Sequence, residues 1–186
     1  AYGYSFAKRL IEPAIRAYRE EFNTNVIGAI PNGIFGEEDN FSDNAPMLPS
    51  LIRRFYESKE NNNDIIVWGD GSPLREYTYS TDVAKSFIWM LENYDENLSL
   101  NTGSTEENSI KEIAYMISDK MGIDKKRIKF DTTKPKGIFR KPTDNSIFLS
   151  KSKFKYTKFS EGLSRTIEWF DYTYKNNKDK IKISKK

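Results

Sequence analysis

The sequence predicts an α/β fold that contains at least part of a parallel β-sheet. Short apolar runs typical of buried strands alternate with longer segments whose apolar residues recur every three or four positions, as on one helix face. Glycine, proline and asparagine separate these segments. Strands that alternate with helices favour parallel pairing, and 186 residues suffice for a hydrophobic core.

Helices are predicted from this periodicity and from capping residues. The first helix covers residues 4–22, and Pro13 predicts a kink because proline cannot donate the backbone hydrogen bond. Ser80 or Thr81 is predicted to cap a helix that starts at 82, and Ser109 with Glu112 forms a predicted capping box. The predicted helices cover residues 4–22, 47–60, 82–94, 109–122 and 160–176.

Strands are predicted where short apolar runs end in turn residues. They cover residues 25–30, 64–69, 76–79, 98–103 and 127–131. A polar loop follows at 37–46 and a long loop at 132–146. The lysine-rich end, 175–186, is expected to be solvated or frayed rather than to bind nucleic acid.

The composition limits the possible chemistry. The chain has no cysteine and no histidine, so no disulfide, thiolate metal site, cysteine nucleophile or histidine base is expected, and no metal site is predicted. Proton transfer must fall to Tyr, Lys, Asp or Glu. The net charge is only +3, and no signal peptide or apolar run long enough to span a bilayer is seen. We therefore expect a cytoplasmic protein without membrane or nucleic-acid partners.

Tyr4 and Lys8 are spaced to share one helix face. A lysine ammonium favours the phenolate, and such a pair suits donation of a proton to a carbonyl oxygen as hydride reaches its carbon. The spacing alone is weak evidence, because a half-buried aromatic beside a solvated lysine explains it as well. Tyr174 and Lys178 repeat it near the lysine-rich end, where no catalytic role is expected.

Three later segments give the pair a context. PNGIFG (31–36), WGDGSPLREYTYSTDVA (68–84) and NTGSTEENSIKEIA (101–114) follow one another in an order that resembles the extended short-chain dehydrogenase/reductase family, which acts on sugar nucleotides. LPSLIRRF, VWGDGSPLRE and FDTTKPKGIFRK are most similar to its GDP-L-fucose synthase branch. The likeness runs from Tyr4 to about Phe170.

The resemblance implies the C-terminal part of a Rossmann-like enzyme together with a small α/β substrate-binding domain. Residues 1–36 and 76–103 would be the remainder of the NADP-binding domain, and 37–75 with 104–176 the nucleotide-sugar domain. Residues 177–186 would be a basic tail. The sequence has no G-x-G-x-x-G loop, so the N-terminal dinucleotide-binding βαβ units are expected to be missing from it.

The resemblance also assigns roles in NADPH-dependent reduction of a GDP-4-keto sugar. Tyr4 would give a proton to the C4 keto oxygen, and Lys8 would lower the Tyr4 pKa and bind the ribose of NADP(H). The residues along the nicotinamide end would be Pro31, Asn32, Gly33 and Ile34.

The sugar nucleotide would be held by a second group of residues. The residues that match its binding positions, or have charge suited to its phosphates, are Arg54, Trp68, Arg75, Lys136 and Arg140. Other interpretations stay open. One of Arg53 and Arg54 is expected to be merely solvated, Trp68 could be core, and Arg75 could brace its loop against Asp70 or Glu76.

Two departures from the family qualify the activity. The histidine that the family uses for 3,5-epimerisation falls at about Pro46, so this step is expected to be lost or impaired. Lys136 replaces an acid that is common in the family. The alternatives are another nucleotide-sugar epimerase or dehydratase, or a non-catalytic nucleotide-sugar-binding or dimerisation module. Family members pair through the Tyr-Lys helix, which implies a homodimer.

Overall fold

The computed structural model describes residues 2–183. Its helices are α1 (Tyr2–Arg9), α2 (Ile11–Phe22), α3 (Met47–Asn61), α4 (Ser80–Asn93), α5 (Ile110–Met121), α6 (Ser146–Ser152) and α7 (Phe159–Asn176), with short 3-10 helices η1 (Lys125–Arg127) and η2 (Lys178–Lys180). Its strands are β1 (Ala29–Ile30), β2 (Gly33–Phe35), β3 (Ile65–Trp68), β4 (Leu74–Tyr79), β5 (Leu100–Asn101), β6 (Glu107–Ser109) and β7 (Ile128–Asp131).

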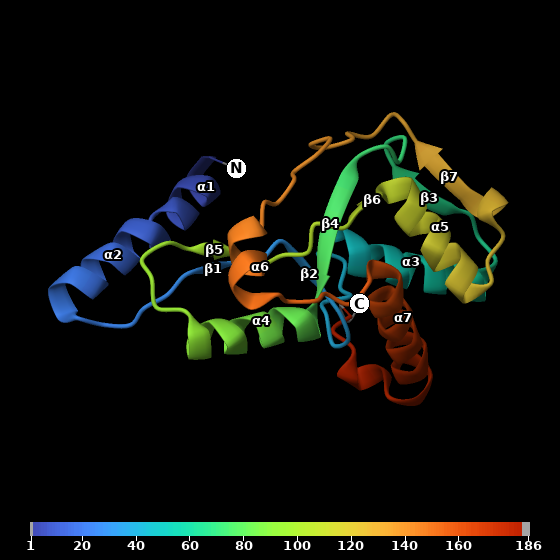
Figure 1. Cartoon of the computed structure of the whole chain (residues 1–186). Helices are drawn as coiled ribbons and strands as arrows, with labels where there is room; N and C mark the ends of the chain where they lie inside the picture. The colour runs from blue at the N-terminus through green and yellow to red at the C-terminus, as the bar shows by residue number, and fades with distance from the viewer. Residues whose placement is uncertain (1, 184–186) are drawn as a thin grey trace.

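The predicted α/β class is confirmed, because the strand pairs β1–β5, β2–β4 and β3–β7 are parallel. The pair β4–β6 is antiparallel. Figure 1 shows β4 running between the β1–β5 pair at one end of the molecule and the β3–β7 pair at the other. Strand β4 therefore connects the two regions to which the sequence assigns cofactor and substrate.

Aromatic and aliphatic side chains form two buried clusters. The larger lies among α3, α5, α7 and strands β2–β4, and includes Phe35, Phe55 and Phe170. The smaller joins α4 and β5 to Phe148 of α6. Helix α6 was not predicted, because its seven residues, which begin at the end of the predicted loop, are too few to show periodicity. Strands β2 and β6, three residues each, were missed for the same reason.

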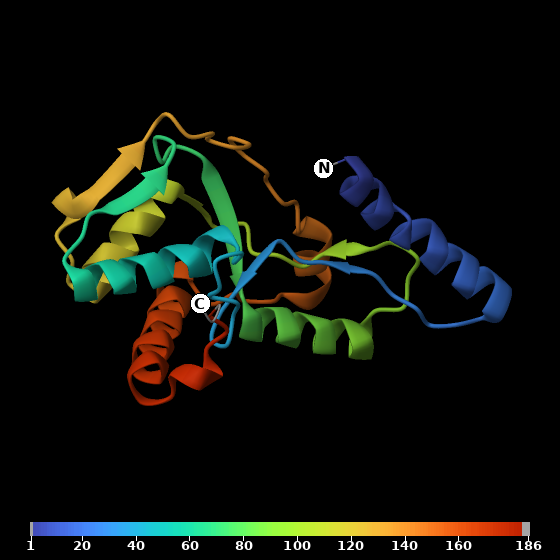
Figure 2. The ribbon, with the colours of Figure 1, turned by 180° about the vertical axis from the view of Figure 1, so that it is seen from behind.

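The predicted interruption of the first helix is confirmed, and it falls at Leu10. Pro13 has no N–H to donate to the Arg9 carbonyl, and its ring would crowd that carbonyl in a continuous helix. Figure 2 shows α1 and α2 projecting from one end of the molecule. Only Ile15 of these helices is buried. Their large exposed side chains are Tyr2, Tyr4, Phe6, Leu10, Ile11, Tyr18 and Phe22.

Of the two predicted helix N-terminal caps, the cap of α4 is wrong and the cap of α5 is confirmed. Helix α4 begins at Ser80, two residues early, with Tyr79 as the N-cap residue and no side-chain cap hydrogen bond, so the predicted Ser80 or Thr81 cap is wrong. Strand β4 runs directly into this helix, which leaves no loop in which a capping side chain could sit. The capping box at α5 is confirmed: Ser109 Oγ accepts from the Glu112 N–H at 3.1 Å.

The lysine-rich end is solvated, as expected, over most of its described part, residues 175–183, because residues 175–180 and 182 are exposed. It is anchored at Ile181 and is not frayed there. Ile181 is 5% exposed in the larger core, and the Phe41 N–H donates to the Lys182 carbonyl at 3.1 Å. Only the alternative of a frayed end is wrong for this part, because Ile181 and Ile183 pack against the core between exposed lysines. Residues 184–186 lie outside the described part. Within residues 2–183, no helix combines the length and hydropathy needed to cross a bilayer.

Candidate functional site

A cavity of about 630 Å³ lies beside the ends of β3 and β4. Four predicted substrate-binding residues line it: Arg54 from α3, Trp68 from β3, Arg75 from β4 and Lys136 from the loop after β7. Sequence positions 82 residues apart thus meet in one hollow. We call the loop between β7 and α6, residues 132–145, the cavity loop.

Arg54 turns its guanidinium toward the cavity wall. Its Nη1 donates to the Ile66 carbonyl at 2.7 Å, whereas its buried Nε has no hydrogen-bond partner among the described residues. Burial lowers the pKa of Arg54. The expectation that one of Arg53 and Arg54 is merely solvated is wrong, because Arg53 is mostly buried and pairs with Asp43 and Glu57.

Trp68 is a surface residue of the cavity and not part of the core. Strand β3 alternates, so that Ile65 and Val67 point inward while Ile66 and Trp68 point outward. Trp68 is 61% exposed, and the Lys134 ammonium lies 5.9 Å from its ring centroid. A flat aromatic face is thus available at the cavity wall.

Arg75 and Lys136 connect the cavity loop to the rest of the wall. Arg75 Nη1 donates to the Ile138 carbonyl at 2.9 Å. Its side chain therefore pairs with the backbone of the cavity loop, and not with the carboxylate of Asp70 or Glu76. Lys136 Nζ lies 2.6 Å from Asp70 Oδ2. The hydrogen bond from Lys136, with those from Ser72, holds the pKa of Asp70 well below its usual range.

Arg140 does not line the cavity. It forms a bidentate ion pair with Glu107, with both hydrogen bonds at 2.7 Å. This contact lowers the pKa of Glu107 and raises that of Arg140. The structure therefore separates Arg140 from the four residues of the cavity.

Residues 31–34, which we call the 31–34 turn, follow β1 and include the first two residues of β2. The side-chain amide of Asn32 is held inside the protein: its Oδ1 accepts from Thr78 Oγ1 at 2.6 Å, and its Nδ2 donates to the Ser104 carbonyl at 2.7 Å. A Cβ on Gly33 would lie 2.8 Å from the Tyr77 ring, so only glycine lets the turn approach β4 this closely. The polar side chain of Asn32 is therefore engaged within the protein, which leaves backbone groups and the exposed Ile34 side chain for a ligand at this turn.

Tyr4 and Lys8 share one face of α1, as predicted. Tyr4 is 70% exposed, and Lys8 Nζ lies 5.7 Å from its ring centroid. The second pair is closer: Lys178 donates to the Tyr174 hydroxyl at 2.8 Å, but Tyr174 packs against Tyr56 in the larger core region. Contact between the two side chains therefore does not by itself distinguish a catalytic pair.

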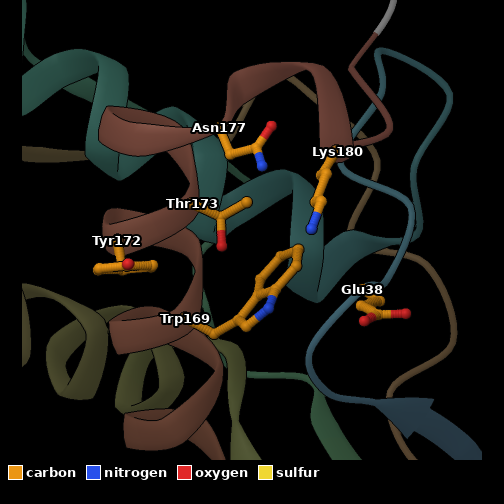
Figure 3. A pocket seen from close by; sticks show the side chains of 6 residues that line it. All are labelled: Glu38, Trp169, Tyr172, Thr173, Asn177 and Lys180. Carbon is orange, nitrogen blue, oxygen red and sulfur yellow. The ribbon is translucent and has the colours of Figure 1, made fainter.

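A second cleft, of about 460 Å³, lies between α7, η2 and the loop at Glu38. Figure 3 shows Trp169 and Lys180 facing each other across it. None of the predicted site residues lines this cleft; its lining residues are Glu38, Trp169, Tyr172, Thr173, Asn177 and Lys180.

Sequence reasoning missed three acidic residues that organise the cavity loop. Asp70 holds Lys136, Glu107 holds Arg140, and Glu76 accepts from the Thr143 N–H at 3.0 and 3.1 Å. The sequence showed that Asp70 follows a predicted strand and that Glu76 lies beside Arg75, but Glu107 begins β6, a strand that was not predicted. Their partners were not visible in the sequence, because all three lie more than thirty residues away along the chain.

Parallel strands that end beside a cavity with arginines and an exposed aromatic ring define an α/β protein with a site suited to a nucleotide derivative. The chain belongs to the NAD dependent epimerase/dehydratase family, which its residues 1–103 match. Within this family it is similar to GDP-L-fucose synthases. The GDP-L-fucose synthase of Dictyostelium discoideum is 36% identical, with 92% of this chain and 55% of that protein covered. The putative GDP-L-fucose synthase 2 of Arabidopsis thaliana is 37% identical, with 90% and 51% covered.

The comparison with solved structures gives the same family resemblance. The crystal structure of a GDP-L-fucose synthetase from Naegleria fowleri bound to NADP superposes with a TM-score of 0.86 at 32% identity. The superposition covers 93% of this chain and 54% of that one. The chain spans about half the length of the curated relatives it matches.

Proposed function

We propose that the chain carries the nucleotide-sugar site of an NADP(H)-dependent reductase that acts on a GDP-4-keto sugar, as in GDP-L-fucose synthases. The convergence of Arg54, Trp68, Arg75 and Lys136 on one cavity carries this proposal. The guanidinium groups suit a diphosphate because each can pair with two oxygens, and Trp68 offers a face for stacking a base.

The proposed cofactor contact is the 31–34 turn together with Lys8. The turn follows strand β1, which pairs in parallel with β5, and the ends of parallel strands are where such ligands bind. The Asn32 side chain is engaged within the protein, so we assign the contact with the nicotinamide end to the backbone of the turn. Bound NADPH would supply hydride to the C4 carbon. Tyr4 would then donate its proton to the keto oxygen, and the Lys8 ammonium beside it would favour the resulting phenolate.

Binding of GDP to the 186-residue chain tests the substrate site. Calorimetric titration should give a one-site isotherm with GDP, and Arg54→Ala should weaken it at least roughly tenfold. Absence of binding to the folded wild-type chain would reject the proposed site. Titration with UDP and dTDP separates a GDP-sugar enzyme from other nucleotide-sugar epimerases or dehydratases.

Tyr4→Phe tests the proposed proton donor, and Tyr174→Phe is its matched control because the second pair has the same spacing. The assay measures NADPH oxidation with a GDP-4-keto sugar, in the chain joined to a dinucleotide-binding half from a relative. Tyr4→Phe should lower kcat by roughly a hundredfold or more, and Tyr174→Phe should leave it within about twofold. Equal rates for both variants would reject Tyr4 as the donor.

Reduction without epimerisation is the finer proposal. Pro46, at the family's histidine position, is the N-cap residue of α3 between the cavity residues Ala45 and Met47, and its side chain cannot carry a proton. In labelled water, the same joined protein should reduce C4 without placing label at C3 or C5. Rapid enzyme-dependent label uptake at either carbon would contradict this.

A non-catalytic binding module is the second candidate, favoured by the absence of a G-x-G-x-x-G loop from the 186 residues. Titration with NADPH separates the two: tight binding by this chain alone argues for a catalytic unit, whereas GDP binding without NADPH binding argues for a module that needs a partner half.

The proposed homodimer through α1 and α2 rests on their exposed apolar side chains. Light scattering on wild type and on Phe6→Asp tests it.

A further inference from the structure

Strand β4 contacts both proposed ligand regions through neighbouring residues. Arg75 lines the cavity and holds the cavity loop at Ile138. Glu76, the next residue, points to the other face of the strand and is 9% exposed. Two side chains that alternate on one strand thus reach two different parts of the molecule.

Glu76 contacts both the cavity loop and the 31–34 turn. Its two oxygens accept from the Thr143 N–H at 3.1 and 3.0 Å, and its Oε2 also accepts from Asn32 Nδ2 at 3.3 Å. Thr78, on the same face of β4, donates to the other side of the Asn32 amide. A buried carboxylate with donors from two separate segments holds those segments together, because either donor alone would leave part of its charge unpaired.

We propose that Glu76 is a positioning residue that couples the substrate cavity to the cofactor turn. Together with the direct hydrogen bond from Asn32 Nδ2 to Thr143 Oγ1 at 3.4 Å, it holds the cavity loop beside the 31–34 turn, so that a nucleoside diphosphate in the cavity also orders the backbone that would face the nicotinamide. The naming of these two ligands rests on the proposed function, whereas the coupling between the two segments does not. Within the described part of the chain, the hydrogen bonds of the Glu76 carboxylate run to Asn32 and Thr143 and to none of the four cavity residues, Tyr4 or Lys8.

Glu107 provides a matched control. It lies directly opposite Glu76 in the antiparallel β4–β6 register and also holds the cavity loop, through Arg140. It has no described hydrogen bond to the 31–34 turn. Two opposed glutamates would repel each other, so each needs its own donor from the cavity loop.

Hydrogen exchange of backbone amides on the ligand-free 186-residue chain tests the coupling. Glu76→Ala should speed exchange roughly tenfold in both 139–145 and 32–34, because it removes a buried acceptor shared by the two segments. Glu107→Ala should speed exchange near residue 140 and leave 32–34 unchanged. Glu76→Gln should restore only part of the protection. One amide oxygen at the Oε2 position reaches both donors, but the amide NH₂ at the Oε1 position would face the Thr143 N–H, which now lies 3.1 Å from that oxygen.

The same variants are then measured with GDP. In wild type, GDP should slow exchange in the cavity loop and in 32–34, and in Glu76→Ala only in the cavity loop. Unchanged exchange at 32–34 in ligand-free Glu76→Ala, or equal effects there of Glu76→Ala and Glu107→Ala, overturns the coupling. If GDP does not bind wild type, the proposed function fails, and the ligand-free comparison still decides the coupling. If Glu76→Ala does not fold, the exchange rates of Glu76→Gln and Glu76→Asp are compared instead. Glu76→Asp should lose protection at 32–34, because its shorter side chain does not reach both donors.

Discussion

The guanidinium of Arg140 and the carboxylate of Glu107 face each other in a bidentate pair, with Nε–Oε1 and Nη2–Oε2 distances of 2.7 Å. The sequence had suggested Arg140 for a ligand phosphate. Its two donors toward Glu107 are instead engaged in a contact that holds the cavity loop against β6. A charged residue near a site can thus serve the site by holding the loop that forms it.

This pair predicts a pH-dependent stability. Because Arg140 lowers the folded-state pKa of Glu107 below its ordinary 4.5, the stabilising effect is complete above that value and is lost as the pH falls through the folded-state pKa. Urea midpoints of wild type and Glu107→Gln should differ by a constant amount from about pH 7 to about pH 5.5 and converge below about pH 4.5. A difference that persists unchanged to the lowest pH would contradict the assignment.

Replacement of Arg54 by lysine should weaken GDP binding at least roughly tenfold, because an ammonium keeps the charge but cannot form the planar paired contact with a diphosphate. Arg53→Lys is the matched control, since Arg53 precedes it on α3 but is engaged with Asp43 and Glu57. Calorimetric titration with GDP measures both. Similar losses in the two variants would show that α3 as a whole, rather than Arg54, had been disturbed.

Trp68→Ala should weaken GDP about tenfold and leave pyrophosphate binding nearly unchanged, because stacking on an aromatic face is worth about 1–3 kcal/mol per base. Thermal stability should change little, since Trp68 is 61% exposed. Trp68→Phe should recover much of the GDP affinity. A loss of equal size for GDP and pyrophosphate would place Trp68 outside the base contact.

Ile181→Ala should destabilise the protein by about 2–5 kcal/mol, the range for removing a buried isoleucine side chain. Ile181 is 5% exposed within the larger core, although it lies in a lysine-rich segment. The neighbouring Lys180→Ala, at an exposed position, should change stability by less than about 0.5 kcal/mol. Chemical denaturation measures both, and equal effects would mean that the C-terminal segment does not pack as described.

Local signals were sufficient where neighbouring residues decide the structure. The helix near 47–60, the strand near 64–69 and the Ser109–Glu112 capping box were all predicted, because periodicity and capping depend on residues a few positions apart. Strand ends were less accurate. The strand predicted at 25–30 is only Ala29–Ile30, since its length depends on pairing with β5, 71 residues later.

The sequence by itself determined the α/β class, the residue types available for chemistry and, through its resemblance to a family, five candidate residues for a sugar nucleotide. Only the tertiary structure decided which charged side chains face that cavity. Arg54, rather than Arg53, lines it; Arg140 turns to Glu107; and Glu76 reaches Thr143 and Asn32. The reason is physical: the partner of a charged side chain is set by strands and loops that meet only after folding, at separations that no local pattern records.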